Sequence, residues 1–192
     1  MKSLRLLAAF AALSTLSALT ACTSPTALIA EATTPAEDRS FSDSTADAGI
    51  KLDIDKRLLE QDSKLFVDVN TVVYEGRVLL TGKVETQAAH DTAERIVQQT
   101  PNVKEVINEI VVTKDQTFAS GINDVAIEVK IKAQLVATKG IKSINYRWRC
   151  VAGTVYVIGL AQSAEELSSV IEVIRRIEGV KRVVNYARVR GS

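Results

Sequence analysis

The sequence predicts an α+β fold in which one structural unit occurs twice. A short apolar strand bracketed by glycines occupies residues 76–82 and again residues 153–159, an offset of 153 − 76 = 77 residues. The patterns before and after both strands repeat at this offset without a gap. Periodic helices can match by chance, but glycines, helix caps and alternating strands in a common register do not, so the chain is a two-copy protein.

The first unit, residues 47–114, opens with an amphipathic helix. Ile50, Ile54 and Leu58 recur every four residues, and this spacing gives a helix one apolar face. Residues 67–73 then alternate between apolar and polar side chains, as in a half-buried strand. The glycine-bracketed strand follows, so the two strands predict a hairpin. One glycine suits its turn, and the other suits a bend or a close backbone approach.

A second helix and a third strand complete the unit. Thr86 is suited to cap a helix over roughly 87–99, and Pro101 ends it. Residues 103–112 form the last strand. The second unit, residues 122–192, repeats this order of helix, strand, strand, helix and strand after a linker at 115–121.

Strand parity divides the side chains of the second unit between two faces. The inward set on its first strand is Ile144, Tyr146, Trp148 and Cys150. We therefore expect Trp148 to be substantially buried. The opposite face receives Arg147, Arg149, Arg182, Arg188 and Arg190, together with Tyr156, Ile158, Val184 and Tyr186. This is a basic, partly aromatic sheet face to which no helix is assigned.

The two units differ in charge although they share a pattern. Residues 45–114 hold nine Lys/Arg and twelve Asp/Glu, net −3, whereas residues 122–192 hold twelve and six, net +6. The basic face has three interpretations. It is an ordinary solvated surface, or it binds anionic lipid headgroups at ~1 kcal/mol per basic residue. In the third, its apolar residues pack against the first unit, whose corresponding face carries Val72, Leu79, Ile107 and Val111.

The N-terminus predicts a lipid anchor. Two basic residues precede an apolar run that is too short to span a bilayer and has the form of a secretory signal. The run ends in Leu19-Thr20-Ala21-Cys22, which resembles the lipobox of bacterial lipoproteins, whose cysteine is lipidated. The alternative is a plain signal peptide with a chance cysteine. On the first interpretation residues 1–21 are the signal peptide, and residues 22–46 hold lipidated Cys22 and a flexible tether.

The glycine-bracketed strands and the matching ends Val103–Asn108 and Val180–Asn185 resemble the BON domain. With the lipobox and tether, nearly the whole chain resembles the dual-BON outer-membrane lipoproteins of the division- and outer-membrane-stress-associated lipid-binding family. The resemblance implies two tandem BON domains, each with a three-stranded mixed sheet packed on two helices. It also implies anchoring in the outer membrane facing the periplasm, binding of anionic phospholipid mainly by the second domain, and a role in outer-membrane integrity.

No catalytic, metal or cofactor site is predicted. Two cysteines and one histidine are too few for a Cys/His metal cluster. His90 is expected on the surface, and Cys150 is expected as a buried thiol. Glu165 and Glu166 lie in the first turn of a helix, where the macrodipole favours acids. With Cys22 lipidated no disulfide is expected, and the lipobox excludes nucleic acid as a partner.

We therefore expect a non-enzymatic lipoprotein that binds an anionic phospholipid membrane. The alternative is a periplasmic adaptor or chaperone-like module that contacts outer-membrane or division-site envelope proteins. Two surfaces are candidates for the lipid site. The resemblance implies the start of the second domain's first helix, at Val125, Ala126, Val129 and Lys130, where small Ala126 replaces the family's membrane-inserting aromatic residue. The charge pattern favours instead the face of Arg147, Arg149, Arg182, Arg188 and Arg190.

Overall fold

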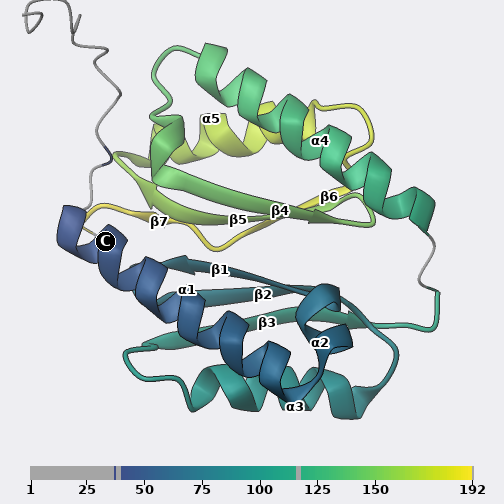
Figure 1. The fold of residues 1–192 in the computed structure, drawn as a ribbon. Coiled ribbons are helices and arrows are strands. Elements are labelled where there is room, and N and C mark those ends of the chain that lie inside the picture. The colour runs from purple at the N-terminus through teal and green to yellow at the C-terminus, as the bar shows by residue number, and fades with distance from the viewer. Residues whose placement is uncertain (1–36, 38–39, 116–117, 192) are drawn as a thin grey trace, which may run out of the picture. The chain divides into compact units, whose positions relative to one another are not determined.

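The computed structural model describes residue 37, residues 40–115 and residues 118–191. The expected signal peptide, Cys22 and most of the expected tether lie outside the described residues. The described part contains two α+β repeats (Figure 1). None of its helices is long and apolar enough to cross a membrane.

The first repeat is a three-stranded mixed sheet with helices on one face. β1 pairs antiparallel with β2, and β2 pairs parallel with β3, in the order β1-β2-β3. The elements are α1 (Phe41–Gln61), α2 (Ser63–Asp68), β1 (Val69–Tyr74), β2 (Arg77–Val84), α3 (Gln87–Gln98) and β3 (Glu105–Val112). The Ser40 side chain accepts a bond from the Asp43 amide and starts α1, so residues 41–46, expected within the tether, are helical.

The second repeat has the same order and the same mixed pairing. β4 pairs antiparallel with β5, and β5 pairs parallel with β6 and then with β7. The elements are α4 (Phe118–Ala137), a 3₁₀ turn (Ser143–Asn145), β4 (Tyr146–Val151), β5 (Thr154–Ala161), α5 (Ala164–Arg175), β6 (Arg182–Asn185) and β7 (Arg188–Val189). The last strand is interrupted where the Asn185 side chain bonds both backbone groups of Ala187.

The bracketing glycines have the two roles that the sequence predicts. Gly76 and Gly153 follow Glu75 and Ala152, and all four residues have positive φ, as a tight hairpin turn requires. At the other end of each strand, Gly82 and Gly159 lie so close to neighbouring backbone atoms that a side chain would not fit. A Cβ on Gly159 would lie 2.3 Å from the carbonyl oxygen of Asn145.

A carboxylate joins the first helix of each repeat to its hairpin. Asp47 accepts bonds from the amides of Glu75 at 2.7 Å and Gly76 at 2.8 Å. Asp124, at the matching position, accepts from Ala152 at 2.7 Å and Gly153 at 2.9 Å. These buried acids satisfy turn amides that face away from the sheet, and they fix the helix against the turn.

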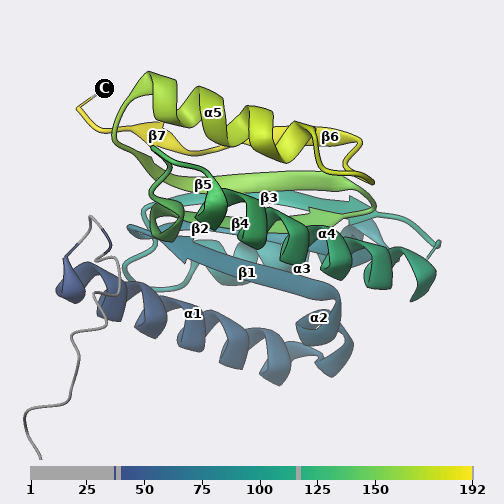
Figure 2. The same cartoon turned by 90° about the horizontal axis from the view of Figure 1, so that it is seen from above.

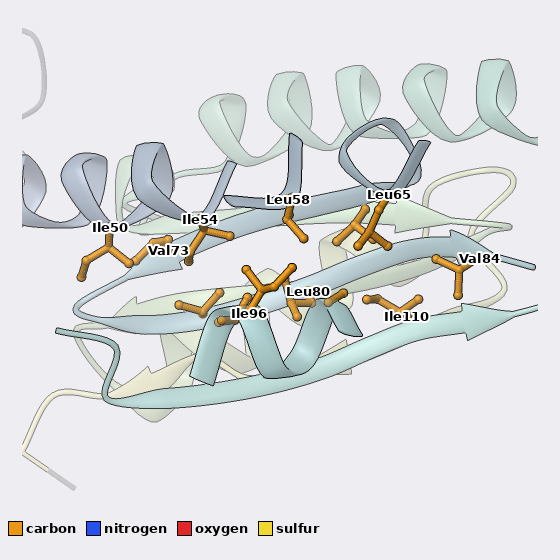
Figure 3. Close-up of a cluster of buried hydrophobic side chains, with 13 residues drawn as sticks. Ile50, Ile54, Leu58, Leu65, Val73, Leu80, Val84, Ile96 and Ile110 are labelled. Carbon is orange, nitrogen blue, oxygen red and sulfur yellow. The ribbon is translucent and has the colours of Figure 1, made fainter. Parts of the chain in front are cut away.

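Each repeat has its own core between sheet and helices. The first core contains Ile50, Ile54 and Leu58 of α1, Leu80 of β2 and Ile96 of α3, among others (Figure 3). The second contains Ile127, Ile131, Leu135, Tyr146, Cys150 and Ile174. Trp148 packs against this second core and most of its surface is covered, which agrees with the expectation of substantial burial. The parity assignment is therefore right, and the part of the indole that remains accessible lies on β4, an edge strand of the sheet.

A third apolar cluster joins the outer faces of the two sheets. It contains Val72, Tyr74, Leu79 and Ile107 of the first repeat with Val151, Tyr156 and Ile158 of the second. The first repeat therefore covers the middle of the expected basic face. This agrees with the third interpretation of that face, in which its apolar residues pack against the first unit. Val111, expected in the same set, lies outside the cluster and is partly exposed.

Candidate functional site

α4 carries apolar side chains on two faces. One face, with Ile127, Ile131 and Leu135, enters the core. The other is exposed: its residues Ile122, Val125, Val129 and Val136 have 61–67% of their surface accessible. Their spacing of three, four and seven residues places them on one stripe of the helix.

This stripe borders a groove between α4 and the edge strand β4. Figure 2 shows α4 lying along β4. The hollow between them has a volume of about 770 Å³, in the range of small-molecule sites. It is lined by Val125, Glu128, Val129, Lys132 and Val136 of α4, by Ile141–Ile144, and by Tyr146, Arg147, Trp148 and Arg149 of β4.

Trp148 and Glu128 hold the two walls of the groove together. The indole Nε1 of Trp148 donates to the backbone oxygen of Glu128 at 3.3 Å. The Glu128 carboxylate accepts from the amide of Cys150 at 2.8 Å, so a side chain of α4 satisfies an outward-facing amide of β4. The groove is therefore a preformed feature of the repeat.

The two arginines of β4 line the groove, and each is oriented by its own backbone. Arg147 donates from Nη1 to the carbonyl oxygens of Ile144 at 2.7 Å and Tyr146 at 3.0 Å. Arg149 donates to the carbonyl oxygen of Trp148 and to the carboxylate of Glu128, at 3.3 and 3.4 Å. Lys132 of α4 and Lys142 of the loop before the 3₁₀ turn add positive charge to the lining.

The family of the chain follows from comparison with known proteins. The BON-domain model matches residues 46–114 and 123–191, which are the two repeats. The chain belongs to the BON-domain family. The fold class predicted from the sequence, α+β with tandem BON domains of mixed three-stranded sheets, is confirmed.

Three relatives extend this result. An uncharacterized protein of the gshII 5′ region of Anaplasma centrale is 46% identical over 147 residues, 76% of this chain and 96% of that protein. Outer membrane lipoprotein DolP of Haemophilus influenzae is 27% identical over 128 residues, 66% of each chain. Osmotically-inducible protein Y of Escherichia coli is 24% identical over 146 residues, 75% of this chain and 73% of that protein. The chain is thus related to a protein of the bacterial outer membrane.

The groove of the second BON domain combines parts of both candidate surfaces. Val125 and Val129 come from the expected helix site, and Arg147 and Arg149 come from the expected sheet site. They meet because β4, which carries the arginines, is the strand beside α4.

The remaining candidates lie elsewhere on this domain. Ala126 and Lys130 line a separate hollow of about 450 Å³, where Lys130 pairs with Glu178 at 3.3 Å. Arg182, Arg188 and Arg190 lie on or beside β6 and β7, across β5 from β4. Arg188 pairs with Glu105 of the first BON domain at 2.7 Å. The five arginines therefore do not form one free surface.

Sequence reasoning missed Val136 and Lys132 as parts of the site. The repeat itself contains the information that could have found the aliphatic positions, because Leu52 and Leu59 of the first BON domain are the counterparts of Val129 and Val136 and are also exposed. The charges differ, since the counterpart of Lys132 is Asp55. Both BON domains thus expose aliphatic residues on the first helix, and the second surrounds them with basic side chains.

The acids and the thiol singled out in the sequence have structural roles. Glu166 is buried and accepts from the amides of Lys142 at 2.8 Å and Gln162 at 2.6 Å, which ties the helix start to the loop before β4. Cys150 is buried as expected, without a disulfide partner among the described residues. Those residues also contain no cluster of three or more metal-ligating side chains. His90 contacts Asp91 at 2.9 Å.

Proposed function

We propose that this chain is a non-enzymatic, periplasm-facing outer-membrane lipoprotein. In this proposal its second BON domain binds anionic phospholipid at the α4–β4 groove and so supports outer-membrane integrity. The observation that carries the proposal is the exposed aliphatic stripe of α4 beside a rim of four basic side chains. Kinship with an outer membrane lipoprotein supports the location.

The groove offers the two interactions that an interfacial site needs. Aliphatic side chains of α4 gain free energy by leaving water for the acyl boundary, at about 25 cal/mol per Å². Basic residues near an anionic surface contribute ~1 kcal/mol each. Trp148 lies partly buried in the groove and supplies an aromatic ring of the kind that favours the interface, although α4 has small Ala126 where the family carries an aromatic residue.

Lipidated Cys22 is the second membrane anchor in this proposal. One weak membrane signal binds reversibly, and two together anchor stably. Cys22→Ala is expected to abolish metabolic labelling with palmitate. Labelling that persists in this variant would rule out Cys22 as the anchor.

The apolar half of the proposal is tested by matched substitutions in the two domains. In soluble protein of residues 23–192, Val129→Ser with Val136→Ser is expected to weaken co-sedimentation with phosphatidylglycerol vesicles about tenfold, because the stripe no longer enters the interface. Leu52→Ser with Leu59→Ser makes the same change at the matching positions of the first domain and is expected to leave binding unchanged. Equal losses in both variants would remove the site from the groove.

The electrostatic half is tested by charge reversal. Arg147→Glu with Arg149→Glu is expected to weaken binding to anionic vesicles more than Val125→Ser does. Wild-type binding is expected to fall steeply with added salt. Arg175→Glu with Arg176→Glu, at the exposed C-terminal end of α5, is the control of equal charge. Equal binding to neutral and anionic vesicles would contradict the electrostatic version, and no binding to either would favour the envelope-protein adaptor.

A further inference from the structure

The Arg147 guanidinium is already occupied by an internal carboxylate. Its Nη2 donates to Oε1 of Glu37 at 3.1 Å, across 110 positions of sequence. Its Nη1 is used by the backbone oxygens of Ile144 and Tyr146. The Glu37 carboxylate therefore holds the position at which Nη2 would meet an oxygen of a lipid phosphate.

This ion pair is well formed for a surface contact. The side chain of Glu37 is only 13% exposed and that of Arg147 is 36% exposed. The second carboxylate oxygen of Glu37 also accepts from the hydroxyl of Ser44, at 3.4 Å. A partly buried pair of this kind is screened less by solvent than a fully exposed one, so it competes effectively with a ligand for the arginine.

Glu37 differs from the other acid that contacts a groove arginine. Glu128, the partner of Arg149, lies inside α4 and also holds the Cys150 amide at 2.8 Å, so it is part of the fold. Glu37 precedes the N-cap Ser40 and belongs to the segment that leads to the expected anchor. A competing anion can replace Glu37 without breaking an element of the domain.

Glu37 is also close in sequence to the expected lipid anchor. Cys22 and Glu37 are 15 positions apart in the sequence. If the residues between them form the flexible tether that the sequence predicts, its root-mean-square span is ~21 Å. An anchor on Cys22 would therefore keep the groove close to the membrane that holds the anchor, which raises the effective concentration of headgroups at Arg147.

We propose that Arg147 is the phosphate subsite of the groove and that Glu37 occupies it until an anionic headgroup displaces the carboxylate. This inference rests on the proposed function and adds its regulation. The guanidinium fork suits a phosphate, which can accept from two nitrogens where the carboxylate now accepts from one. Glu37 lowers the affinity of the unanchored domain, and contact with a membrane removes this competition.

The test is the vesicle affinity of a neutral variant. In soluble protein of residues 23–192, Glu37→Gln is expected to bind phosphatidylglycerol vesicles about two- to fivefold more tightly than wild type, the range that a partly exposed ion pair contributes. Binding to phosphatidylcholine vesicles is expected to stay the same. Glu60→Gln makes the same change of net charge on the exposed face of α1 and is expected to have a much smaller effect.

A double variant separates competition at Arg147 from a general charge effect. In an Arg147→Gln background, Glu37→Gln is expected to give no further gain, because the competition has been removed. A gain that survives there, or one equal to that of Glu60→Gln, would overturn the inference and leave the proposed function standing. Wild type that does not bind while Glu37→Gln does would support the inference. Failure of both proteins to bind any vesicle would overturn the inference and the proposed function together.

Discussion

At some matching positions of the two BON domains the residues have the same structural role, and at other positions the role differs. Asp47 and Asp124 hold the same turn amides. Val72 and Arg149 also match by position, yet Val72 lies in the cluster between the sheets and Arg149 lines the groove. The hairpin turn requires an acid at the position of Asp47 and Asp124. The edge strand, in contrast, carries apolar Val72 in one domain and basic Arg149 in the other.

Cys150 provides a prediction at this scale. Burial, and then the Asp124 carboxylate near its Sγ, raises the pKa of the thiol to about 12. Since the thiolate is the reactive form, the folded protein is expected to react with a thiol reagent at pH 8 at least about a hundredfold more slowly than the urea-unfolded protein. Residues 23–192 contain no other cysteine, so the reaction rate measured with a chromogenic thiol reagent is that of Cys150 alone. Rapid labelling of the folded protein would contradict the burial.

At the scale of elements, the hairpin depends on backbone contacts that leave no space for a side chain. Gly82 and Gly159 end the bracketed segments, and in each the position of a Cβ is taken by a backbone carbonyl of the segment before the first strand. The helices are more tolerant. Gly49 of α1 has no atom within 4 Å of the place where its Cβ would lie.

Gly159→Ala is therefore expected to destabilise the second domain. The new methyl group forces the β4–β5 pair apart, at a cost of about 1–3 kcal/mol in the free energy of unfolding. Gly49→Ala is the matched control and is expected to stabilise the first domain by about 0.5–1 kcal/mol. Alanine loses less backbone entropy than glycine when the helix forms, and its methyl group meets no neighbouring atom here. Urea unfolding measures both. A Gly159→Ala protein as stable as wild type would mean that the strands do not approach so closely.

At the scale of the whole molecule, polar contacts border the apolar cluster between the domains. Arg77, buried in the first domain, donates to the backbone oxygen of Tyr186 at 2.8 Å and to Glu105 at 2.7 Å. Arg188 donates to the same Glu105 oxygen at 2.7 Å, and the Tyr186 hydroxyl donates to Glu109. Glu105 thus joins arginines of both domains.

The interface should therefore weaken in acid. The hydrogen bond from Arg77, then the charges of Arg77 and Arg188, hold the pKa of Glu105 below its ordinary 4.5 against the opposing effect of burial. A lowered pKa gives stability that is present above the ordinary value and is lost as pH falls through the folded-state value.

Glu105→Gln tests this contribution. At pH 7 the variant is expected to unfold at lower urea concentration, by about 1 kcal/mol or less because Glu105 is 39% exposed. The difference from wild type is expected to shrink toward pH 3, as the wild-type carboxylate takes up a proton. Glu60→Gln is the exposed control. A difference that stays constant between pH 7 and pH 3 would exclude the charge of Glu105 as its source.

The sequence by itself determined the elements, their order and the repeat. Apolar periodicity, the bracketing glycines and the N-caps, Thr86 of α3 and Ser163 of α5, act over a few residues of chain, so they can be read without the fold. They also identified the inward side of each strand, including that of Trp148. These local patterns do not show what lies against each face of a sheet, because the sequence pattern of a strand is the same whether water or another sheet covers that face.

Only the tertiary structure decided what surrounds those faces. It covered Tyr156 and Ile158 with the first domain, and it brought Val129 beside Arg147 in one groove. It also placed Glu37 on Arg147, although 110 positions separate them. These contacts depend on how sheets and helices pack against each other. Packing between segments that are distant in the sequence leaves no local pattern in the chain.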